Sequence, residues 1–425
     1  MTGDLKKLLG DRKSRVFSGL TSICSAHPRV LSAAFRHGVK RGTPVLVEAT
    51  CNQVNQDGGY TGMTPADFRK RVEAIAIAEG MEIDRLVLGG DHLGPNPWTM
   101  LPAAQAMEKA CAMVAAYVAA GFRKIHLDAS MACADDPASL QETTVAERAA
   151  MLAAAAESAA RRQGLAAPHY VIGTEVPPPG GARERIDTLA ATSAASAEAT
   201  IAAHEEAFAR AGLTTAFDRV AALVVQPGVE FGTENVVAYD PAHARHLGVV
   251  LDRHAGLVFE AHSTDYQSRA SLRALVRDGF AILKVGPGLT FALREALYGL
   301  DAIDAILHKD RAAPSLPDAM EAIMLAEPRH WRGHCHGDER RQYVDRHFSY
   351  SDRIRYYWQN AAAIAAVDGL LARLRGIRIP ETLVSQFFPR QLEGARAAGG
   401  IATPDALIEG TIAAVLDDYA AAENP

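Results

Sequence analysis

The chain has 425 residues, of which 48% are hydrophobic, and its 44 lysines and arginines against 50 aspartates and glutamates give a formal net charge of −6. This balance argues against a nucleic-acid-binding protein, and no apolar stretch reaches the roughly 18 to 20 residues that cross a bilayer, so we expect a cytoplasmic protein that contacts neither nucleic acid nor membrane. The five cysteines form no C-x-x-C pair, which predicts reduced thiols rather than disulfides or a thiolate zinc site.

Short runs rich in Val, Ile and Leu alternate with longer Ala-rich segments of helical spacing over residues 1–290. The eight runs cover residues 17–27, 44–50, 85–92, 124–130, 170–176, 221–228, 257–263 and 281–288. Runs this apolar are typical of parallel strands buried on both faces, with helices as crossovers. Because eight such strands close a barrel, the sequence predicts an α/β fold of the (β/α)₈ TIM-barrel class. An open doubly wound sheet is the alternative, although the G-x-G-x-x-G turn of its dinucleotide-binding version is absent after the first run.

The segments between the runs carry helix signals. Thr64 and Pro65 are typical of an N-cap and first turn, opening a helix that stops at Gly80. A second helix is expected from Ala103 to Gly121, and the Ala-rich tracts near 145–165 and 188–212 are interpreted as helices rather than low-complexity sequence. After the eighth run the alternation stops. Residues 291–425 are therefore predicted to form a helical extension packed on the barrel, without a linker before it.

The carboxyl ends of barrel strands carry the active site, so the tail of each run is the place where catalytic residues are expected. His92, Glu175 and His262 end the third, fifth and seventh runs, and alternate strands contribute to one layer of a barrel interior. Two imidazoles and a carboxylate are typical of a catalytic Zn²⁺ site, or of a site for Mn²⁺ and similar ions. The sequence therefore predicts a divalent metal site. The alternative is three hydrogen-bonded side chains at the barrel mouth.

Asp91 immediately precedes His92 in the string GGDHLGPN. The glycines before this pair and the Gly-Pro-Asn after it indicate that the strand has already ended, so both side chains are expected to face the mouth. A carboxylate at that place can act as general base and acid towards a substrate hydroxyl. Orienting His92 or capping a helix is the alternative role for Asp91.

Polar strand tails and glycine-containing loops are expected to bind the substrate. The amide-rich loop after the second run is suited to a polyol, and the Gly-rich tails of the fifth and eighth runs resemble loops that present backbone N–H groups to phosphate; turn geometry alone also explains such glycines. The predicted substrate-binding residues are Glu48, Asn52, Gln53, Asp128, Ser130, Gly181, Lys284 and Gly286.

A second group of cations lies in the extension, in the string SDRIRYYW at residues 351–358. Its arginines, Arg353 and Arg355, stand next to three aromatic residues and can form an anion clamp or an oligomer contact. A partly buried helix with satisfied arginines is the alternative.

Eight long strings of the chain resemble one protein family. They are EATCNQVNQDGGYTGMTPADFR, GGDHLGPNPW, KIHLDASMACADDP, VIGTEVPPPGG, VVQPGVEF, EAHSTDYQ, LKVGPGLTFALREA and SDRIRYYW. On these strings the chain resembles the GatZ/KbaZ family, the second component of class II D-tagatose-1,6-bisphosphate aldolase, from about residue 15 to at least residue 390. The family is usually described as a non-catalytic subunit that supports a GatY/KbaY-type aldolase subunit in galactitol or N-acetylgalactosamine catabolism.

The resemblance implies an oligomeric aldolase component acting on a ketose or ketose bisphosphate. The family also resembles the class II aldolases, whose barrels hold Zn²⁺ through histidines; by that likeness Asp91 is the proton-transfer residue, and His92 and His262 are ligands. Glu175 departs from the pattern, because the aldolases have a ligand histidine after a similar I-G-T segment. Carboxylate ligands also serve metal sites.

Three functions therefore stay open. The first is a supporting subunit that keeps its own metal site. The second is an autonomous aldolase or ketose 4-epimerase, in which Asp91 removes the C4 hydroxyl proton, the C3–C4 bond cleaves, and recombination on the other face of the aldehyde inverts C4. The third is a tagatose 6-phosphate kinase, a label that some family members carry; the sequence argues against it, because it contains no G-x-x-x-x-G-K-[ST] loop.

Overall fold

The computed structural model describes residues 5–11, 16–174, 189–397, 399 and 402–423. Its centre is a closed barrel of eight parallel strands in the order β11-β12-β3-β4-β5-β6-β7-β8, with β8 pairing back to β11. The strands are β3 (Leu20–Ile23), β4 (Val45–Thr50), β5 (Leu86–Leu93), β6 (Lys124–Leu127), β7 (His169–Ile172), β8 (Val220–Val224), β11 (Val258–Ala261) and β12 (Ile282–Val285). Each overlaps one of the eight predicted runs, with β5, β7 and β8 extending one residue beyond theirs, so the predicted (β/α)₈ barrel is confirmed and the open sheet is excluded.

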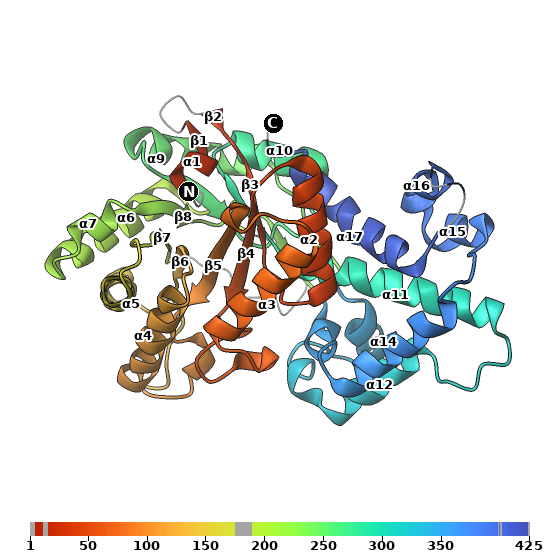
Figure 1. The fold of residues 1–425 in the computed structure, drawn as a ribbon. Coiled ribbons are helices and arrows are strands. Elements are labelled where there is room, and N and C mark those ends of the chain that lie inside the picture. Colours follow the sequence, from red (N-terminus) through yellow and green to blue (C-terminus); the bar gives the residue numbers. More distant parts are fainter. Residues whose placement is uncertain (1–4, 12–15, 175–188, 398, 400–401, 424–425) are drawn as a thin grey trace.

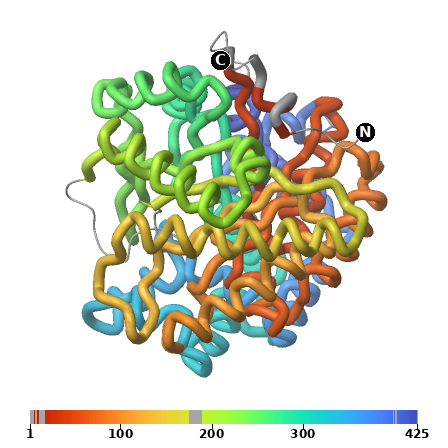
Figure 2. Tube along the Cα trace, turned by 90° about the vertical axis from the view of Figure 1, so that its left-hand side faces the viewer, coloured from red at the N-terminus to blue at the C-terminus, as the bar shows by residue number. Residues whose placement is uncertain are grey.

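Helices follow each strand and form the outer ring (Figure 1). They are α2 (Pro28–Arg41), α3 (Pro65–Ala78), α4 (Ala103–Ala119), α5 (Glu142–Gln163), α6 (Ala194–Arg210), α7 (Thr214–Phe217), α8 (Pro241–Ala244), α9 (Gly248–Arg253), α10 (Arg269–Arg277) and α11 (Pro287–Leu307). The predicted start of α3 is confirmed, since Thr64 and Asp67 form a capping box. The Ala-rich tracts form α5 and α6, which run across the barrel in Figure 2.

Smaller elements lie before and between the barrel units. Helix α1 (Leu5–Leu8) and the antiparallel pair of β1 (Gly10–Asp11) and β2 (Val16–Phe17) precede the barrel, and β9 (Glu230–Phe231) pairs with β10 (Val236–Val237) after β8.

The extension consists of helices that pack on one side of the barrel (Figure 1). They are α12 (Leu316–Ala326), α13 (Glu339–Phe348), α14 (Ala361–Leu374), α15 (Glu381–Phe387), α16 (Leu392–Ala397) and α17 (Pro404–Ala420). Helix α11 occupies the position of the eighth barrel helix, so the predicted boundary at residue 290 falls inside it. Helix α17 packs against α2 and α11, and beyond it the carbonyl of Glu423 accepts a hydrogen bond from the backbone N–H of Gly19, 2.8 Å away at the amino end of the barrel.

The extension also reaches the opposite, carboxyl end of the barrel. The 3₁₀ helix η6 (Arg353–Tyr357) connects α13 to α14, and just before it Asp352 accepts a hydrogen bond from Thr290 in the first turn of α11 at 2.5 Å. All five cysteines are free, as predicted. None of the helices in the described part of the chain is long and apolar enough to span a lipid bilayer.

Candidate active site and metal centre

A cavity opens at the carboxyl end of the barrel, where the loops after the strands meet η6 of the extension. Its lining residues are Cys24, Thr50, Asn52, Gln53, Tyr60, Asp91, His92, Phe231, His262, Ser263, Asp265, Lys284, Gly286, Pro287, Arg355 and Tyr356. Most of these are polar or charged, which suits a hydrophilic ligand.

The end of β5 carries an irregularity that turns two successive side chains into this cavity. The pairing of β5 with β6 changes register between Gly90 and Leu93, and His92 adopts a left-handed backbone conformation with φ of 49°. A bulge of this kind re-aims a side chain that regular alternation would point outward. Asp91 and His92 therefore both line the cavity, although the strand continues to Leu93 rather than ending before them as the sequence indicated.

Two glycines make the tight packing around this strand end possible. A Cβ atom on Gly89 would lie 2.8 Å from Cγ of Glu48, and a Cβ on Gly94 would lie 1.5 Å from the carbonyl oxygen of Asp128. Glycine at these positions lets β5 approach its neighbours on both sides. The two neighbouring strand ends can then bring their charged side chains towards the same point.

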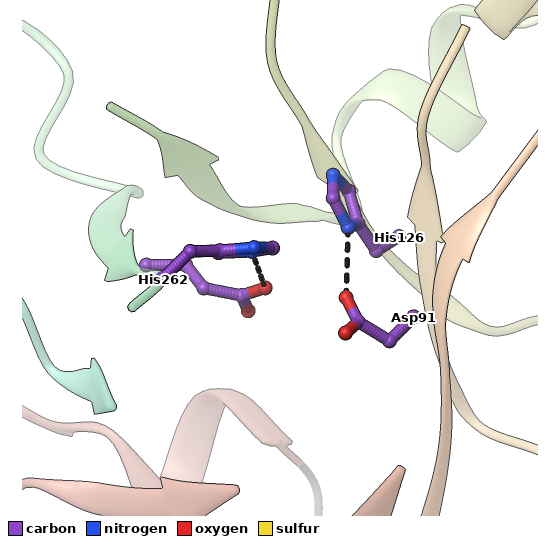
Figure 3. A group of neighbouring side chains, drawn as sticks. Asp91, His126 and His262 are labelled. Carbon is purple, nitrogen blue, oxygen red and sulfur yellow. Dashed lines mark hydrogen bonds and ion pairs between the residues drawn. The ribbon is translucent and has the colours of Figure 1, made fainter. Parts of the chain in front are cut away.

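Three imidazoles meet at the floor of the cavity, which His92 and His262 line, and each is bonded to a carboxylate. Nδ1 of His92 lies 2.7 Å from Asp128, Nδ1 of His126 lies 3.0 Å from Asp91, and Nε2 of His262 lies 3.0 Å from Glu260. Figure 3 shows Asp91 bonded to His126, with His262 close by. Metal-binding histidines commonly hold one ring nitrogen on a carboxylate in this way, which directs the other nitrogen to the ion.

The free nitrogen of His126 is the clearest sign that the group fits a cation. Its Nε2 atom is buried without a hydrogen-bond partner among the described residues. Its Nδ1 also lies 3.2 Å from the backbone N–H of His92, but the ionised Asp91 carboxylate is the stronger partner and favours a proton on Nδ1. Nε2 then carries the lone pair that a metal ligand requires.

The spacing of the rings also suits a shared ion. The ring centroids are 4.7 Å apart for His92 and His262, and 5.2 Å for each of the other two pairs. Imidazoles bonded to one tetrahedral ion at about 2 Å have centroids roughly 5 Å apart. One nitrogen or oxygen from each of Asp91, His126, Glu260 and His262 also lies within 4.8 Å of the others.

Below this group, two lysines are enclosed by carboxylates inside the barrel. Nζ of Lys124 lies 2.8 Å from Glu48 and 2.6 Å from Glu260, while Nζ of Lys284 lies 2.9 Å from Glu48 and 2.8 Å from Asp91. Lys124, Glu48 and Glu260 are completely buried, and Lys284 is 5% exposed. Buried charges of this kind are tolerated only when they are paired.

This network determines the ionisation of Asp91. Burial opposes ionisation of its carboxyl, but the positive charges of His92 and Lys284 outweigh that effect and hold the pKa of Asp91 well below its usual value. Burial likewise opposes the charge on Lys284, but Asp91 and the neighbouring carboxylates raise its pKa well above normal. Asp91 is therefore an ionised proton acceptor at neutral pH.

The histidines differ in charge. Burial lowers the pKa of His262 to about 3, which keeps this imidazole neutral and available as a ligand. Burial also opposes protonation of His92, but its neighbours Asp91 and Asp128 raise the pKa of His92 above the ordinary value. Binding of an ion there would have to release that proton.

The predicted substrate-binding residues are spread over several layers. Asn52 and Gln53 line the cavity, but the side chain of Gln53 is bonded to the backbone of Thr50 and Cys24 and holds the loop in shape. Glu48 lies deeper, in the lysine network. Asp128 holds His92 and accepts a hydrogen bond from Ser130 at 2.6 Å. The roles predicted for these residues stay predictions.

At the eighth strand, the predicted phosphate donors already have partners. The backbone N–H groups of Gly286 and Gly288 donate to Oδ1 of Asp265 at 2.9 and 2.7 Å. Lys284, which also lines the cavity, is enclosed by carboxylates. Glu175 and Gly181 lie outside the described residues.

The extension contributes one cation and one phenol to the cavity wall. Nη2 of Arg355 donates to the hydroxyl of Tyr356 at 2.9 Å, and Arg353 donates to the same hydroxyl at 3.4 Å. Tyr356 stands between the two guanidinium groups, and its ring packs edge-on against Tyr60 from the loop after β4. Burial opposes ionisation of Tyr356, but Arg355 and Arg353 hold its pKa below the ordinary value.

Strained backbone is concentrated around the cavity. In the described part of the chain, the non-glycine residues with positive φ are His92, Ser263, Tyr266 and Asp352, with values from 45° to 64°. The first two line the cavity, and the other two are in the loop after β11 and directly before η6. Such conformations persist only when the surroundings impose them, and they cluster at functional sites.

Three site residues were missed by the sequence interpretation. His126 and Glu260 each stand two residues before a polar strand tail, at Asp128 and His262, and thus point to the same face of their strands. Period-two spacing could have identified them. The role of Asp265 depends on contacts between two loops and has no local signal in the sequence.

Comparisons with known proteins agree on one family. The family model described as "D-tagatose-1,6-bisphosphate aldolase subunit GatZ/KbaZ-like" matches residues 5–424. The D-tagatose 6-phosphate 4-epimerase of Agrobacterium fabrum (strain C58) is 54% identical over 422 residues, which cover 99% of each chain. The crystal structure of a probable tagatose 6 phosphate kinase from Sinorhizobium meliloti 1021 is similar with a TM-score of 0.88 and 52% identity, covering 95% of this chain and 100% of that one.

Proposed function

The chain belongs to the D-tagatose-1,6-bisphosphate aldolase subunit GatZ/KbaZ-like family, and from that premise we propose that it is a metal-dependent ketose-phosphate 4-epimerase. Its substrate under this proposal is D-tagatose 6-phosphate, which it interconverts with D-fructose 6-phosphate. The observation that carries the proposal is the position of the Asp91 carboxyl group in the cavity, beside three imidazoles that are each bonded to a carboxylate. The relative that is named a D-tagatose 6-phosphate 4-epimerase supports the choice of D-tagatose 6-phosphate among the ketose phosphates.

The hydrogen on C4 of a ketose is not next to the carbonyl and is not acidic, so direct deprotonation cannot invert this carbon, whereas cleavage and re-formation of the C3–C4 bond can. The carboxylate of Asp91 accepts the proton of the C4 hydroxyl, the C3–C4 bond cleaves, and C4 becomes the aldehyde of glyceraldehyde 3-phosphate. The electron pair moves into the three-carbon enediolate. After the aldehyde turns over, the C3–C4 bond forms again on its other face, and the new C4 oxygen takes up a proton.

The ion would be held by His92, His126 and His262, with Glu260 and Asp128 orienting two of the rings. Zn²⁺ suits this donor set, and Mn²⁺ or a similar ion is the alternative. When bound, the ion supplies Lewis-acid stabilisation of the negative charge on the substrate oxygens. Lys284 keeps Asp91 ionised before the reaction. The ligand role predicted for Glu175 stays a prediction.

Two groups of the extension complete the mechanism. Among the described residues that line the cavity, the lysine and arginine side chains are Lys284 and Arg355, and Lys284 is enclosed by carboxylates. We therefore assign the substrate phosphate to Arg355. The aldehyde presents its oxygen in two orientations, so the second orientation needs its own proton donor. Tyr356, which enters the cavity from η6 rather than from the barrel, is assigned this role. After Tyr356 gives its proton to the C4 oxygen, solvent water takes up the proton from Asp91 and returns one to Tyr356, so that both groups recover their starting states before the next turnover.

The decisive test is an assay of the purified chain without any partner. Tagatose 6-phosphate is added, and formation of fructose 6-phosphate is followed by NMR in D₂O, with and without a chelator and after addition of Zn²⁺ or Mn²⁺. We expect metal-dependent epimerisation without deuterium at C3 or C4, because neither carbon loses its hydrogen when the C3–C4 bond cleaves. Deuterium at C4 would contradict the cleavage mechanism, and the absence of turnover with either ion would contradict the function.

The family description favours one second candidate, a supporting subunit of a tagatose-bisphosphate aldolase. A GatY/KbaY-like catalytic subunit is added in the same experiment, and triose phosphate release from tagatose 1,6-bisphosphate is measured. A supporting subunit raises that activity equally well as wild type and as Asp91→Asn. For the kinase named in the related structure, ATP consumption with tagatose 6-phosphate is the readout, and we expect none.

A further inference from the structure

The cavity contains a second anion-binding arrangement that is already filled by the chain itself. In TIM barrels, phosphate groups are commonly bound by the loops after strands 7 and 8 and by a helix N-terminus. Here β11 and β12 are the seventh and eighth barrel strands, and the 21-residue helix α11 begins directly after β12. The carboxylate of Asp265, from the loop after β11, accepts the hydrogen bonds of Gly286 and Gly288 at that place.

Asp265 is held there from both sides. The hydroxyl of Thr264 donates to the carbonyl of Lys284 at 2.6 Å, and the hydroxyl of Tyr419 donates to the carbonyl of Thr264 at 2.8 Å. On the other side, the hydroxyl of Tyr266 donates to the carbonyl of Tyr350 at 2.7 Å. These contacts tie the loop to the barrel and to the extension. They therefore fix the backbone on both sides of Asp265.

We infer that Asp265 is a specificity-determining residue. By occupying the backbone N–H groups of Gly286 and Gly288 it rejects a second phosphate ester, so that the cavity takes a ketose monophosphate and not a bisphosphate. The inference rests on the proposed function, since it concerns the substrate of the same site. Two backbone N–H groups that would bind a phosphate oxygen are already satisfied, and a phosphate brought near them meets a carboxylate of the same charge. Specificity of this kind is achieved through repulsion of the wrong ligand.

The charge of Asp265 at neutral pH agrees with this role. Burial raises the pKa of Asp265 to about 6, while the backbone N–H groups of Gly288 and Gly286 favour the ionised form. The carboxylate is therefore charged above pH 7, when it faces the substrate. With Lys284 enclosed by carboxylates, Arg355 is left for one phosphate group.

The test compares binding of fructose 1,6-bisphosphate and fructose 6-phosphate by titration calorimetry, in the Asp91→Asn background so that turnover does not interfere. Asp265→Ala frees the backbone N–H groups of Gly286 and Gly288, and Asp265→Asn keeps an oxygen on these two N–H groups but removes the charge. We expect Asp265→Ala to bind the bisphosphate at least about tenfold more tightly than the parent, a change of about 1.4 kcal/mol. Its affinity for the monophosphate should change less than about threefold, and Asp265→Asn should fall between.

Asp338→Ala is the matched control, because Asp338 also accepts a backbone N–H at a helix start but does not line the cavity. It should leave both affinities unchanged. Bisphosphate binding that is as tight as monophosphate binding in the parent, or that is not improved in either folded Asp265 variant, overturns the inference. Since binding is measured without turnover, a failed epimerase assay would not decide this result, and a failed binding result would not decide the epimerase assay.

Discussion

The barrel and the extension meet at one cavity but contribute different chemistry. The barrel supplies a buried group of acids, lysines and histidines whose members are all within bonding distance of a partner. The extension supplies the buried Arg353 and the partly exposed Arg355, and both pack against the ring of Tyr356, with the guanidinium of Arg355 at 4.4 Å from the ring centroid. A buried charge network is rigid and suits proton transfer and metal binding, whereas a cation at the rim can bind a charged end of a substrate.

This contrast teaches where function can be placed on such a fold. Strands fix the positions of Asp91, His126 and Glu260, because their backbone is bonded on both sides in the barrel. Arg355 depends on the docking of helices that follow the barrel in the chain. Substitutions in the barrel group should therefore affect catalysis, metal content or folding, and substitution of Arg355 should mainly affect substrate affinity.

The largest effect is expected for Asp91→Asn. Asparagine can still accept the hydrogen bond from His126, but it cannot accept a proton from the substrate. We expect kcat to fall by up to about 10⁴-fold, the range of general base catalysis, while bound metal is retained. Epimerisation kinetics and elemental analysis of the same sample measure the two quantities. A variant with more than a tenth of the wild-type kcat would show that Asp91 is not the base.

Lys124→Met tests whether the barrel network is a structural unit. Removing this cation leaves the buried Glu48 and Glu260 with only one shared cation, Lys284, at 2.9 and 3.6 Å. The free energy of unfolding should fall by about 3 to 5 kcal/mol, as for other broken buried ion pairs. Lys109→Met is the control, since the pair of Lys109 with Asp57 is exposed and contributes less than about 1 kcal/mol. Urea unfolding curves of both variants measure these free energies. Equal losses in Lys124→Met and Lys109→Met would contradict the view that the buried network is a structural unit.

His126→Ala tests the metal centre. Removing the ligand nitrogen should lower metal affinity by at least about 100-fold and reduce the metal content of the purified chain. His204→Gln is the matched control, because His204 is equally buried but lies in α6 and is bonded to the carbonyl of Thr200. The control should keep its metal. An unchanged metal content in His126→Ala would exclude this residue as a ligand.

In the extension, Arg355→Met should act on affinity rather than on chemistry. Loss of a charge-assisted contact to phosphate costs about 1.5 to 3 kcal/mol, so KM for tagatose 6-phosphate should rise roughly 10- to 100-fold with kcat changed only a few-fold. Arg353→Met provides the comparison: Arg353 bonds to the carbonyl of His330 and does not line the cavity. If kcat of Arg355→Met fell as far as that of Asp91→Asn, the assignment of Arg355 to substrate binding rather than to chemistry would be wrong.

The smallest effect concerns acid sensitivity. Burial lowers the pKa of His204 in α6 and of His330 in the extension to about 4. A histidine that prefers the neutral form in the fold leaves the unfolded chain with more bound protons between pH 6.5 and 4, so stability is complete above about 6.5 and falls as the pH drops to about 4.

His204→Gln should remove part of that slope, on the order of 2 kcal/mol. The change for His330→Gln should be smaller, because His330 is only about half buried and solvent screens its charge. Unfolding midpoints measured between pH 4 and 7 test whether His204→Gln changes the pH dependence of stability more than His330→Gln does. A larger effect at His330 would show that the extension, and not the barrel, controls acid sensitivity.

The sequence by itself determined the barrel, because an apolar run between two amphipathic helices has few other ways to bury both of its faces. The eight runs, the Thr64 cap and the position of polar residues at the strand ends are all local signals, and the structure confirms the elements that they predicted. The long family motifs identified the family in the same way. Asp91 and His92 were found because they stand together at a strand end.

Only the tertiary structure decided which groups share a contact. Pairing of His126 with Asp91 depends on a bulge in β5, and filling of the α11 N-terminus by Asp265 depends on the register of two neighbouring loops. Arg355 reaches the cavity because the chain after the barrel folds back over the strand ends. These hydrogen bonds join residues that are 21 to 35 positions apart, and no periodicity in the sequence encodes the distance between them. The packing of whole helices and strands sets that distance, so the complete site can be identified only from the folded barrel.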